Sequence, residues 1–127
     1  MVIRLPLTVT HEDMAAFCDL SGDANPLHMD EAYARQLGFN GRVVFGALIV
    51  AKISCLLGMH KPGAGGLWTG LKINFRNPLY LDEKAELTGE ITHLSKATRM
   101  ISLKLRVQVG DRVIATATAE TILKIND

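Results

Sequence analysis

The chain has 127 residues, of which 48% are hydrophobic and 21% are charged, and its formal net charge is +1. This length predicts a single domain over residues 1–127 with a core of its own. The nearly balanced charge argues against a protein that binds nucleic acid by neutralising phosphates. The longest apolar run, residues 43–51, is too short to cross a membrane, and the N-terminus lacks the pattern of a signal peptide. We therefore expect a cytoplasmic protein with neither a membrane nor a nucleic acid as its partner.

The first half of the chain predicts one strand and three helices. We expect the strand at residues 5–10, and its last residue, Thr10, is a suitable N-cap for a helix that ends at residues 21–22. A second, short helix is expected near residues 30–37 and a third over residues 46–57, each followed by a glycine. The third helix is apolar on almost every side, which predicts a central and buried position.

In the second half, apolar and polar residues alternate with the period of half-buried strands. The alternation predicts antiparallel strands at residues 67–76, 85–92, 101–109 and 113–125. One buried helix and one antiparallel sheet together predict an α+β domain, in which the sheet wraps around the third helix.

The two cysteines, Cys18 and Cys55, stand in apolar helical patterns and lack the spacing of a metal-binding pair. This placement predicts two buried, reduced thiols rather than a disulfide or a zinc site.

The segment S-G-D-A-N-P-L-H, residues 21–28, places a carboxylate and an imidazole five residues apart where regular helix is not expected. Its glycine is a flexible joint, and Pro26 keeps Asn25 out of the α region. Asp23 and Asn25 favour turns in which side chains bond to the backbone. Such a turn can bring Asp23 and His28 into one small volume, as an acid and a base acting on one water require. The alternative is an ordinary turn and helix cap with a structural histidine.

Together with the following M-D-E-A-Y-A, the pattern G-D-x-N-P-L-H resembles the signature of the MaoC-like (R)-specific enoyl-CoA hydratases. The run F-N-G-R-V-V-F-G-A-L, residues 39–48, continues the similarity, which is strongest over residues 10–60. The family has a single-hotdog fold. By this resemblance Asp23 and His28 are the catalytic pair, and the backbone N–H of Gly46 faces the thioester oxygen.

The resemblance also implies contacts to the substrate from Asn25, Phe45, Ala47 and Ser54. Asn25 is expected to orient the substrate, and Ser54 corresponds to a serine that bonds near the catalytic aspartate in some members. Phe45 stands where the family commonly has a histidine. If that histidine only holds its loop, Phe45 is a packing substitute and hydration survives. If the histidine polarises the substrate, the activity or the substrate range changes. We favour the first interpretation.

Hydration of a 2-enoyl thioester needs a base for the water, an acid for the α-carbon and donors for the enolate oxygen. A carboxylate and an imidazole can supply the first two. Free N–H groups at the start of a helix, such as that of Gly46, supply the third.

The resemblance thus implies a hydro-lyase of fatty acid metabolism that acts on a thioester of coenzyme A or acyl carrier protein. It implies no metal or redox cofactor, and a homodimer with its site at the interface. One alternative is thioester hydrolysis, which would need a carboxylate or another water-positioning group on the third helix, and residues 46–57 contain no acid. Another alternative is a non-catalytic acyl-binding module. The intact set of Asp23, Asn25 and His28 argues against this alternative, but Phe45, in place of the usual histidine, leaves it open.

Other titratable residues are assigned surface or structural roles. His11 and His60 are expected on the surface. Asp30 is expected at a helix start, and His93 on the inward phase of its strand, as a buried or interface imidazole. Three cations are expected on a solvated face, with binding of coenzyme A phosphates as the alternative: Lys72, Arg76 and Arg99.

Overall fold

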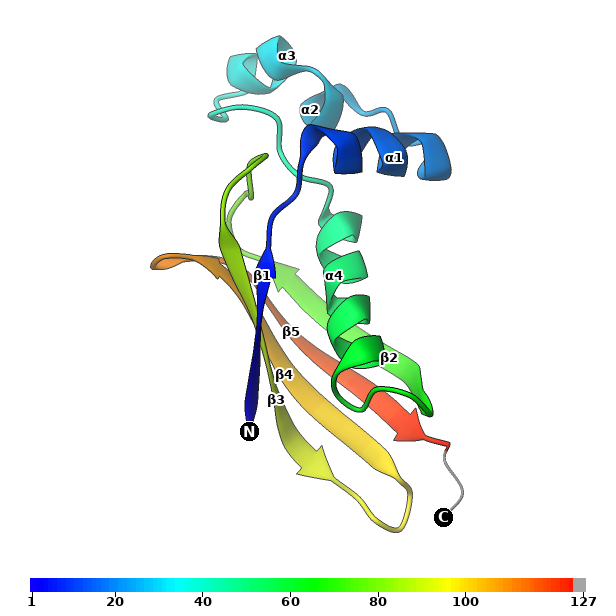
Figure 1. Ribbon diagram of the computed structural model, residues 1–127. Helices are drawn as coiled ribbons and strands as arrows, with labels where there is room; N and C mark the ends of the chain where they lie inside the picture. The colour runs from blue at the N-terminus through cyan, green and yellow to red at the C-terminus, as the bar shows by residue number, and fades with distance from the viewer. Residues whose placement is uncertain (125–127) are drawn as a thin grey trace.

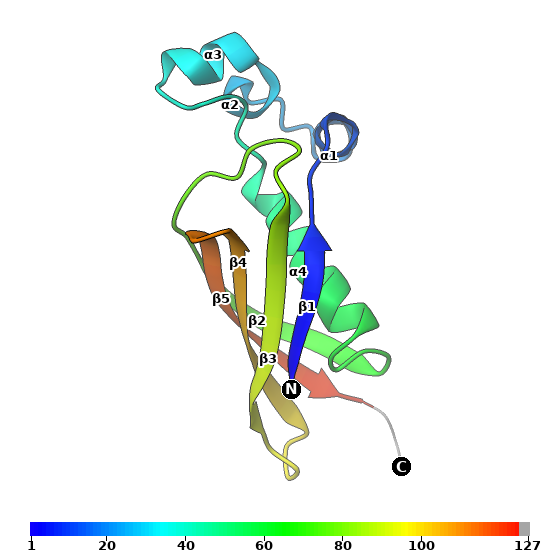
Figure 2. The ribbon, with the colours of Figure 1, turned by 60° about the vertical axis from the view of Figure 1, so that its left-hand side comes forward.

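An antiparallel sheet forms the body of the protein (Figures 1 and 2). The computed structural model describes residues 1–124. Within them the sheet has five strands in the order β1-β3-β4-β5-β2, so that β1 and β2 form its two edges. The strands are β1 (Val2–Leu7), β2 (Gly66–Phe75), β3 (Ala85–Leu94), β4 (Met100–Val109) and β5 (Arg112–Leu123).

The first strand lies earlier than its predicted position at residues 5–10. It pairs with β3 from Val2 opposite Glu90 to Leu7 opposite Ala85. Ala85 is the first residue of β3, so the chain beyond Leu7 has no strand partner and turns toward the first helix. At the other end, β5 stops at Leu123, and the predicted end of that strand at residue 125 lies outside the described residues.

Local capping signals set the bounds of the first helices. The helix α1 (His11–Ser21) begins with a capping box, in which Thr10 Oγ1 accepts from the Asp13 N–H at 3.2 Å. Gly22 ends this helix in the left-handed region, with φ of 78°. The helix α3 (Glu31–Gln36) is capped by Asp30, as predicted. Between them lies α2 (Pro26–Met29), a single helical turn that was not predicted. It can form because proline is acceptable at the first position of a helix.

The longest helix, α4 (Gly46–Met59), lies along one face of the sheet (Figure 1). Its buried residues Ile49, Ile53, Leu56 and Leu57 belong to the core. Leu56 approaches the sheet at Gly89, where a Cβ would lie only 2.9 Å from the Leu56 Cδ2 atom. The absence of a side chain at Gly89 therefore allows this close contact.

The prediction that this helix is buried on every side is wrong for the single chain. Its other face, which includes Ala47, Ala51 and Ser54, is exposed. Cys55 is exposed as well and Cys18 is half-buried, so the expectation of two buried thiols is also wrong. The apolar pattern indicated the face on the sheet, but it could not show that a second apolar face remains uncovered.

A β-bulge changes the alternation at the end of β3. Ile91 pairs with Leu103, whereas His93 pairs with Ser102, so the register shifts by one residue between them. The shift moves His93 off the inward phase, and its side chain is exposed in the single chain, so of the two predicted places, the core and an interface, the core is wrong. Strict alternation cannot anticipate such an inserted residue. No helix in residues 1–124 combines the length and the apolar character needed to cross a membrane.

Candidate active site

A cavity of about 370 Å³ opens where the start of α4 meets the end of β2. His28 from α2 and Gly46 from α4 line it together with apolar and loop residues that include Ile49, Phe75 and Arg76. A mostly apolar cleft with a few polar groups is the usual form of a small-molecule site. A more polar cavity of about 580 Å³ lies beside residues 40–42 and contains none of the predicted site residues.

The turn before α2 is built from two successive side-chain bonds to the backbone. Asp23 Oδ1 accepts from the Asn25 N–H at 3.1 Å, and Asn25 Oδ1 accepts from the Leu27 N–H at 2.9 Å. Asn25 has the extended ψ of 127° expected before Pro26 and caps the helix. Asp23 and Asn25 are exposed, and within residues 1–124 no hydrogen bond joins Asp23 to His28. The turn is as predicted, but the acid and imidazole are not in direct contact.

The imidazole of His28 has a defined orientation. Its Nδ1 lies 2.6 Å from the carbonyl oxygen of Val43. A carbonyl oxygen can only accept, so Nδ1 carries the hydrogen and Nε2 is the nitrogen left for chemistry. The half-buried ring also packs on Phe45, with ring centroids 4.3 Å apart.

Phe45 is a core residue beneath this imidazole. Only 2% of it is exposed, and its ring lies 4.7 Å from that of Phe17 on the side of α1. The residue does not belong to the lining of the 370 Å³ cavity, although its neighbours Val44 and Gly46 do. This placement agrees with the reading of Phe45 as a packing substitute.

Gly46 begins α4 at the cavity. Its preceding N-cap residue, Phe45, makes no side-chain capping bond, so no side chain satisfies the first N–H groups of the helix. A Cβ on Gly46 would lie 3.0 Å from the Cζ atom of Phe75, because the aromatic ring at the end of β2 covers the glycine. The N-terminus of α4 therefore lies at a cleft that His28 also lines.

The other predicted contacts lie outside the cavity in the single chain. Ala47 and Ser54 are on the exposed face of α4, and Asn25 is exposed beside α2. Asp30 caps α3 by accepting from the Tyr33 N–H at 3.1 Å, as expected of a helix-start acid. His11 and His60 are exposed as predicted.

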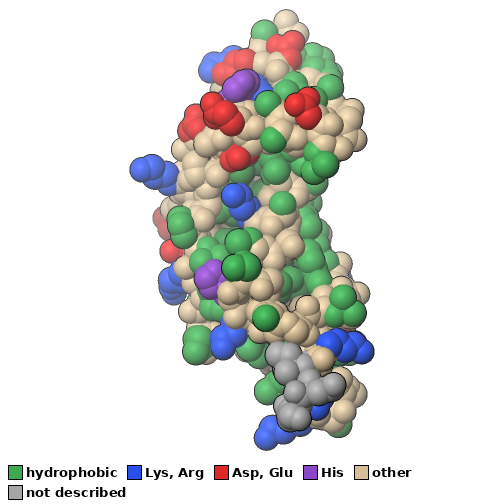
Figure 3. Space-filling view, turned by 45° about the vertical axis from the view of Figure 1, so that its right-hand side comes forward, with side chains coloured by type: hydrophobic (Ala, Val, Ile, Leu, Met, Phe, Trp, Pro, Cys, Tyr) green, Lys and Arg blue, Asp and Glu red, His purple; other side chains and the backbone are tan. Residues whose placement is uncertain are grey.

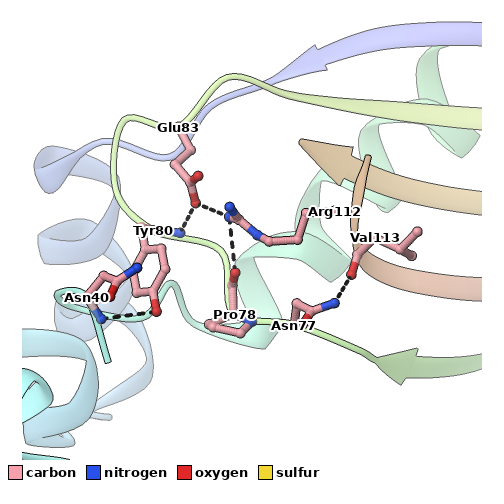
Figure 4. A network of polar contacts seen from close by, with 7 residues as sticks. All are labelled: Asn40, Asn77, Pro78, Tyr80, Glu83, Arg112 and Val113. Carbon is pink, nitrogen blue, oxygen red and sulfur yellow. Dashed lines mark hydrogen bonds and ion pairs between the residues drawn. The ribbon is translucent and has the colours of Figure 1, made fainter. Parts of the chain in front are cut away.

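Residues 77–79 line the cavity, and the segment that they begin, residues 77–83, is held by polar contacts that the sequence did not reveal (Figure 4). The Tyr80 hydroxyl accepts from the Asn40 N–H at 3.2 Å, and the Tyr80 N–H donates to Glu83 Oε1 at 2.8 Å. Glu83 also forms an ion pair with Arg112 of β5. Tyr80 lies 40 residues from Asn40 in the chain, and Glu83 lies 29 residues from Arg112, and no periodicity marks these residues as partners.

Two further bonds tie this wall to β5 (Figure 4). Arg112 Nη2 donates to the Pro78 carbonyl oxygen at 3.4 Å, and Asn77 Nδ2 donates to that of Val113 at 2.7 Å. The Val44 N–H donates to the Leu79 carbonyl oxygen at 2.8 Å, which joins the wall to the segment before α4.

Comparison with known proteins assigns this arrangement to a family. Residues 1–115 match the model of the MaoC like domain. The chain belongs to the MaoC-like family. A 3-hydroxybutyryl-CoA dehydratase of Methylorubrum extorquens is 30% identical over 111 residues, which cover 87% of this chain and 71% of that protein. An (R)-specific enoyl-CoA hydratase of Aeromonas caviae is 32% identical over 113 residues, covering 89% of this chain and 84% of the relative.

Solved structures confirm the hotdog fold of this MaoC-like protein. An (R)-hydratase from A. caviae superimposes with a TM-score of 0.91 at 31% identity, covering 97% of this chain and 94% of that one. An R-hydratase from Pseudomonas aeruginosa gives a TM-score of 0.90 at 24% identity, covering 99% and 81%, a likeness of fold. The protein is thus an enzyme of the hydratase and dehydratase class, as predicted.

Proposed function

We propose that this MaoC-like protein adds water to the double bond of a 2-enoyl thioester with (R) specificity, or removes water from a 3-hydroxyacyl thioester in reverse. The observation that carries the proposal is one cavity lined by both His28 and the N-terminus of α4. Relatives named as acting on 3-hydroxybutyryl-CoA and on 3-hydroxyacyl-[acyl-carrier-protein] support a thioester of either carrier as substrate.

The start of α4 is suited to hold the thioester oxygen. In the transition state this oxygen gains enolate charge, which the free N–H of Gly46 and the helix dipole would stabilise. Phe45 offers no capping side chain that would compete for these donors. A glycine at this position lets the carbonyl approach without meeting a Cβ.

Asp23 and His28 are assigned the two proton transfers: one group takes a proton from the bound water, whose oxygen adds to the β-carbon, and the other group delivers a proton to the α-carbon. His28 presents Nε2, because its Nδ1 is bonded to Val43. Asp23 uses Oδ1 in the turn with Asn25, which leaves Oδ2 to bind the water. The water would bridge these two groups, consistent with the lack of a direct bond between them.

A homodimer through β2 would complete the site. This edge strand has ten residues, and its exposed Leu67 and Phe75 lie at its two ends. Its free edge has unpaired N–H and C=O groups, which a second copy of β2 can satisfy. The face that includes α4 and β2 also exposes hydrophobic side chains along the middle of the molecule (Figure 3). Pairing there would cover Ala47 and Ser54 and bring a second copy beside the cavity.

The test is loss of the absorbance of the conjugated enoyl thioester, followed with crotonyl-CoA and longer analogues. The (R) product would be identified with a stereospecific 3-hydroxyacyl dehydrogenase. Release of free thiol, measured in parallel, detects hydrolysis, for which the acid-free sequence of α4 gives no support. Unchanged absorbance with every acyl chain, at an enzyme concentration that suffices for a relative, would refute the proposal.

A further inference from the structure

Residues 42 and 43 hold the short helix that carries His28. Arg42 Nε donates to the His28 carbonyl oxygen at 2.7 Å, and Arg42 Nη2 lies 3.5 Å from Met29 Sδ. The Val43 N–H donates to the Leu27 carbonyl oxygen at 3.2 Å. Three consecutive residues of α2 are therefore held by two residues of the segment that leads into α4.

The helix α2 cannot orient His28 by itself. It has four residues and none of them is buried. A single turn fixes several dihedral angles for very few hydrogen bonds and is unstable alone. The carbonyl groups at its end have no helical partner, and the cationic Arg42 supplies one through a charge-assisted bond.

Arg42 is itself fixed from two other helices. Its backbone N–H donates to Glu31 Oε1 of α3 at 2.8 Å, and its Nη1 lies 2.9 Å from His11 Nδ1 of α1. A guanidinium can only donate, so the His11 nitrogen accepts. A Cβ on Gly41 would lie 2.8 Å from Glu31 Oε1, so the glycine leaves room for this carboxylate.

We propose that Arg42 is the positioning residue for His28: it fixes α2 against Val43 so that the imidazole keeps Nδ1–H on the Val43 carbonyl and Nε2 toward the cavity. Val43 supplies the acceptor for the ring, and Arg42 keeps the backbone of His28 within reach of it. Arginine bonds to the His28 carbonyl through Nε and to His11 through Nη1, two nitrogens held apart in a planar fork, whereas lysine offers all its donors from one nitrogen. For the effect on turnover, the inference rests on the proposed function.

The test combines the tautomer of His28 with steady-state kinetics. Long-range ¹H–¹⁵N correlation spectra, recorded where the imidazole is neutral, report which ring nitrogen carries the hydrogen. Wild type should show Nδ1–H alone, and Arg42→Ala should show a mixture of both tautomers. We expect kcat of Arg42→Ala to fall on the order of 10- to 100-fold with little change in KM, because a small misplacement of a catalytic group costs that much. Arg42→Lys should recover part of this loss.

Two control variants separate this role from general effects of charge and folding. Arg4→Ala removes another arginine, whose ion pair with Glu86 is exposed and shares no partner with Arg42, and it should leave both the tautomer and kcat unchanged. His11→Ala removes one partner of Arg42 but leaves its bond to His28, so its effect should be much smaller than that of Arg42→Ala. Arg42→Met keeps the aliphatic stem without a donor and replaces Arg42→Ala if the latter does not fold.

The readouts distinguish failure of this inference from failure of the proposed function. If wild type lacks hydratase activity, the tautomer spectra still decide whether Arg42 positions His28. A folded Arg42→Ala or Arg42→Met variant with wild-type tautomer would overturn the inference. So would the failure of both variants to fold, which would make Arg42 a folding residue instead.

Discussion

Substitution of Gly46 by alanine tests the proposed oxyanion site most directly. The new Cβ would lie 3.0 Å from Phe75 Cζ and 3.3 Å and 3.4 Å from the two Cε atoms of the same ring. Contacts this short require the ring to move by a few tenths of an ångström. Phe75 is 51% exposed in the single chain, so its ring can move without disturbing the core of that chain.

The expected effects on stability and on activity differ. Alanine gains at most about 1 kcal/mol over glycine in a helix, and displacement of the Phe75 ring offsets part of this gain. We therefore expect the free energy of unfolding to change by less than about 1 kcal/mol. Loss of one oxyanion donor typically lowers the rate about 100-fold, which corresponds to about 2.7 kcal/mol of transition-state stabilisation.

The assay is kcat/KM for hydration of crotonyl-CoA, together with urea unfolding of each variant. Phe75→Ala serves as the matched background, because it removes the ring that the new methyl group meets. If Gly46→Ala still lowers kcat/KM about 100-fold in the Phe75→Ala background, the methyl group itself blocks the backbone donor of residue 46. Recovery of activity in that background would refute the oxyanion role and assign the loss to the displaced ring. Undiminished activity of Gly46→Ala alone would place the donor elsewhere.

The remaining predictions concern the acid–base pair, the assembly and the core. Asp23→Asn and His28→Ala should each lower kcat about 100-fold or more with the far-ultraviolet circular dichroism unchanged, and a near-normal rate in either would contradict its assigned role. Light scattering at micromolar concentration should give twice the chain mass of 13.9 kDa, whereas the mass of one chain would argue against pairing through β2. Gly89→Ala should lower the free energy of unfolding by about 1–3 kcal/mol because its Cβ would overlap Leu56. Gly70→Ala is the control, since the nearest atom to its Cβ lies at 3.8 Å, and an equal loss in both variants would contradict the packing argument.

The parts of the fold that depend on neighbouring residues could be predicted from the sequence. Thr10 and Asp13 form the capping box of α1, and Asp30 caps α3, because these bonds span only three residues. The turn at Asp23 and Asn25 follows from the same local chemistry. These features are set by side chains that bond to nearby backbone, whatever the rest of the chain does.

Features that depend on distant partners were missed or predicted wrongly. The bulge before His93 is visible only in the pairing of β3 with β4. Arg42 belongs to the run of residues 39–48 that carries the family resemblance, and nothing local indicated that it would reach the carbonyl group of His28. Tyr80 meets the backbone of Asn40 across 40 residues, a contact that no short-range pattern encodes.

The two edges of the sheet differ in how readily another strand can join them. The β1 edge has six residues and contains Pro6, which has no N–H to donate, whereas the β2 edge has ten residues. If two chains pair only through their β2 edges, the edges left free in the dimer are the two β1 strands. These do not readily accept another strand, so assembly stops at two chains. We expect concentrated solutions of this protein to contain pairs and not fibres. Replacement of Pro6 would restore an N–H to the β1 edge and so make open-ended assembly through that edge easier.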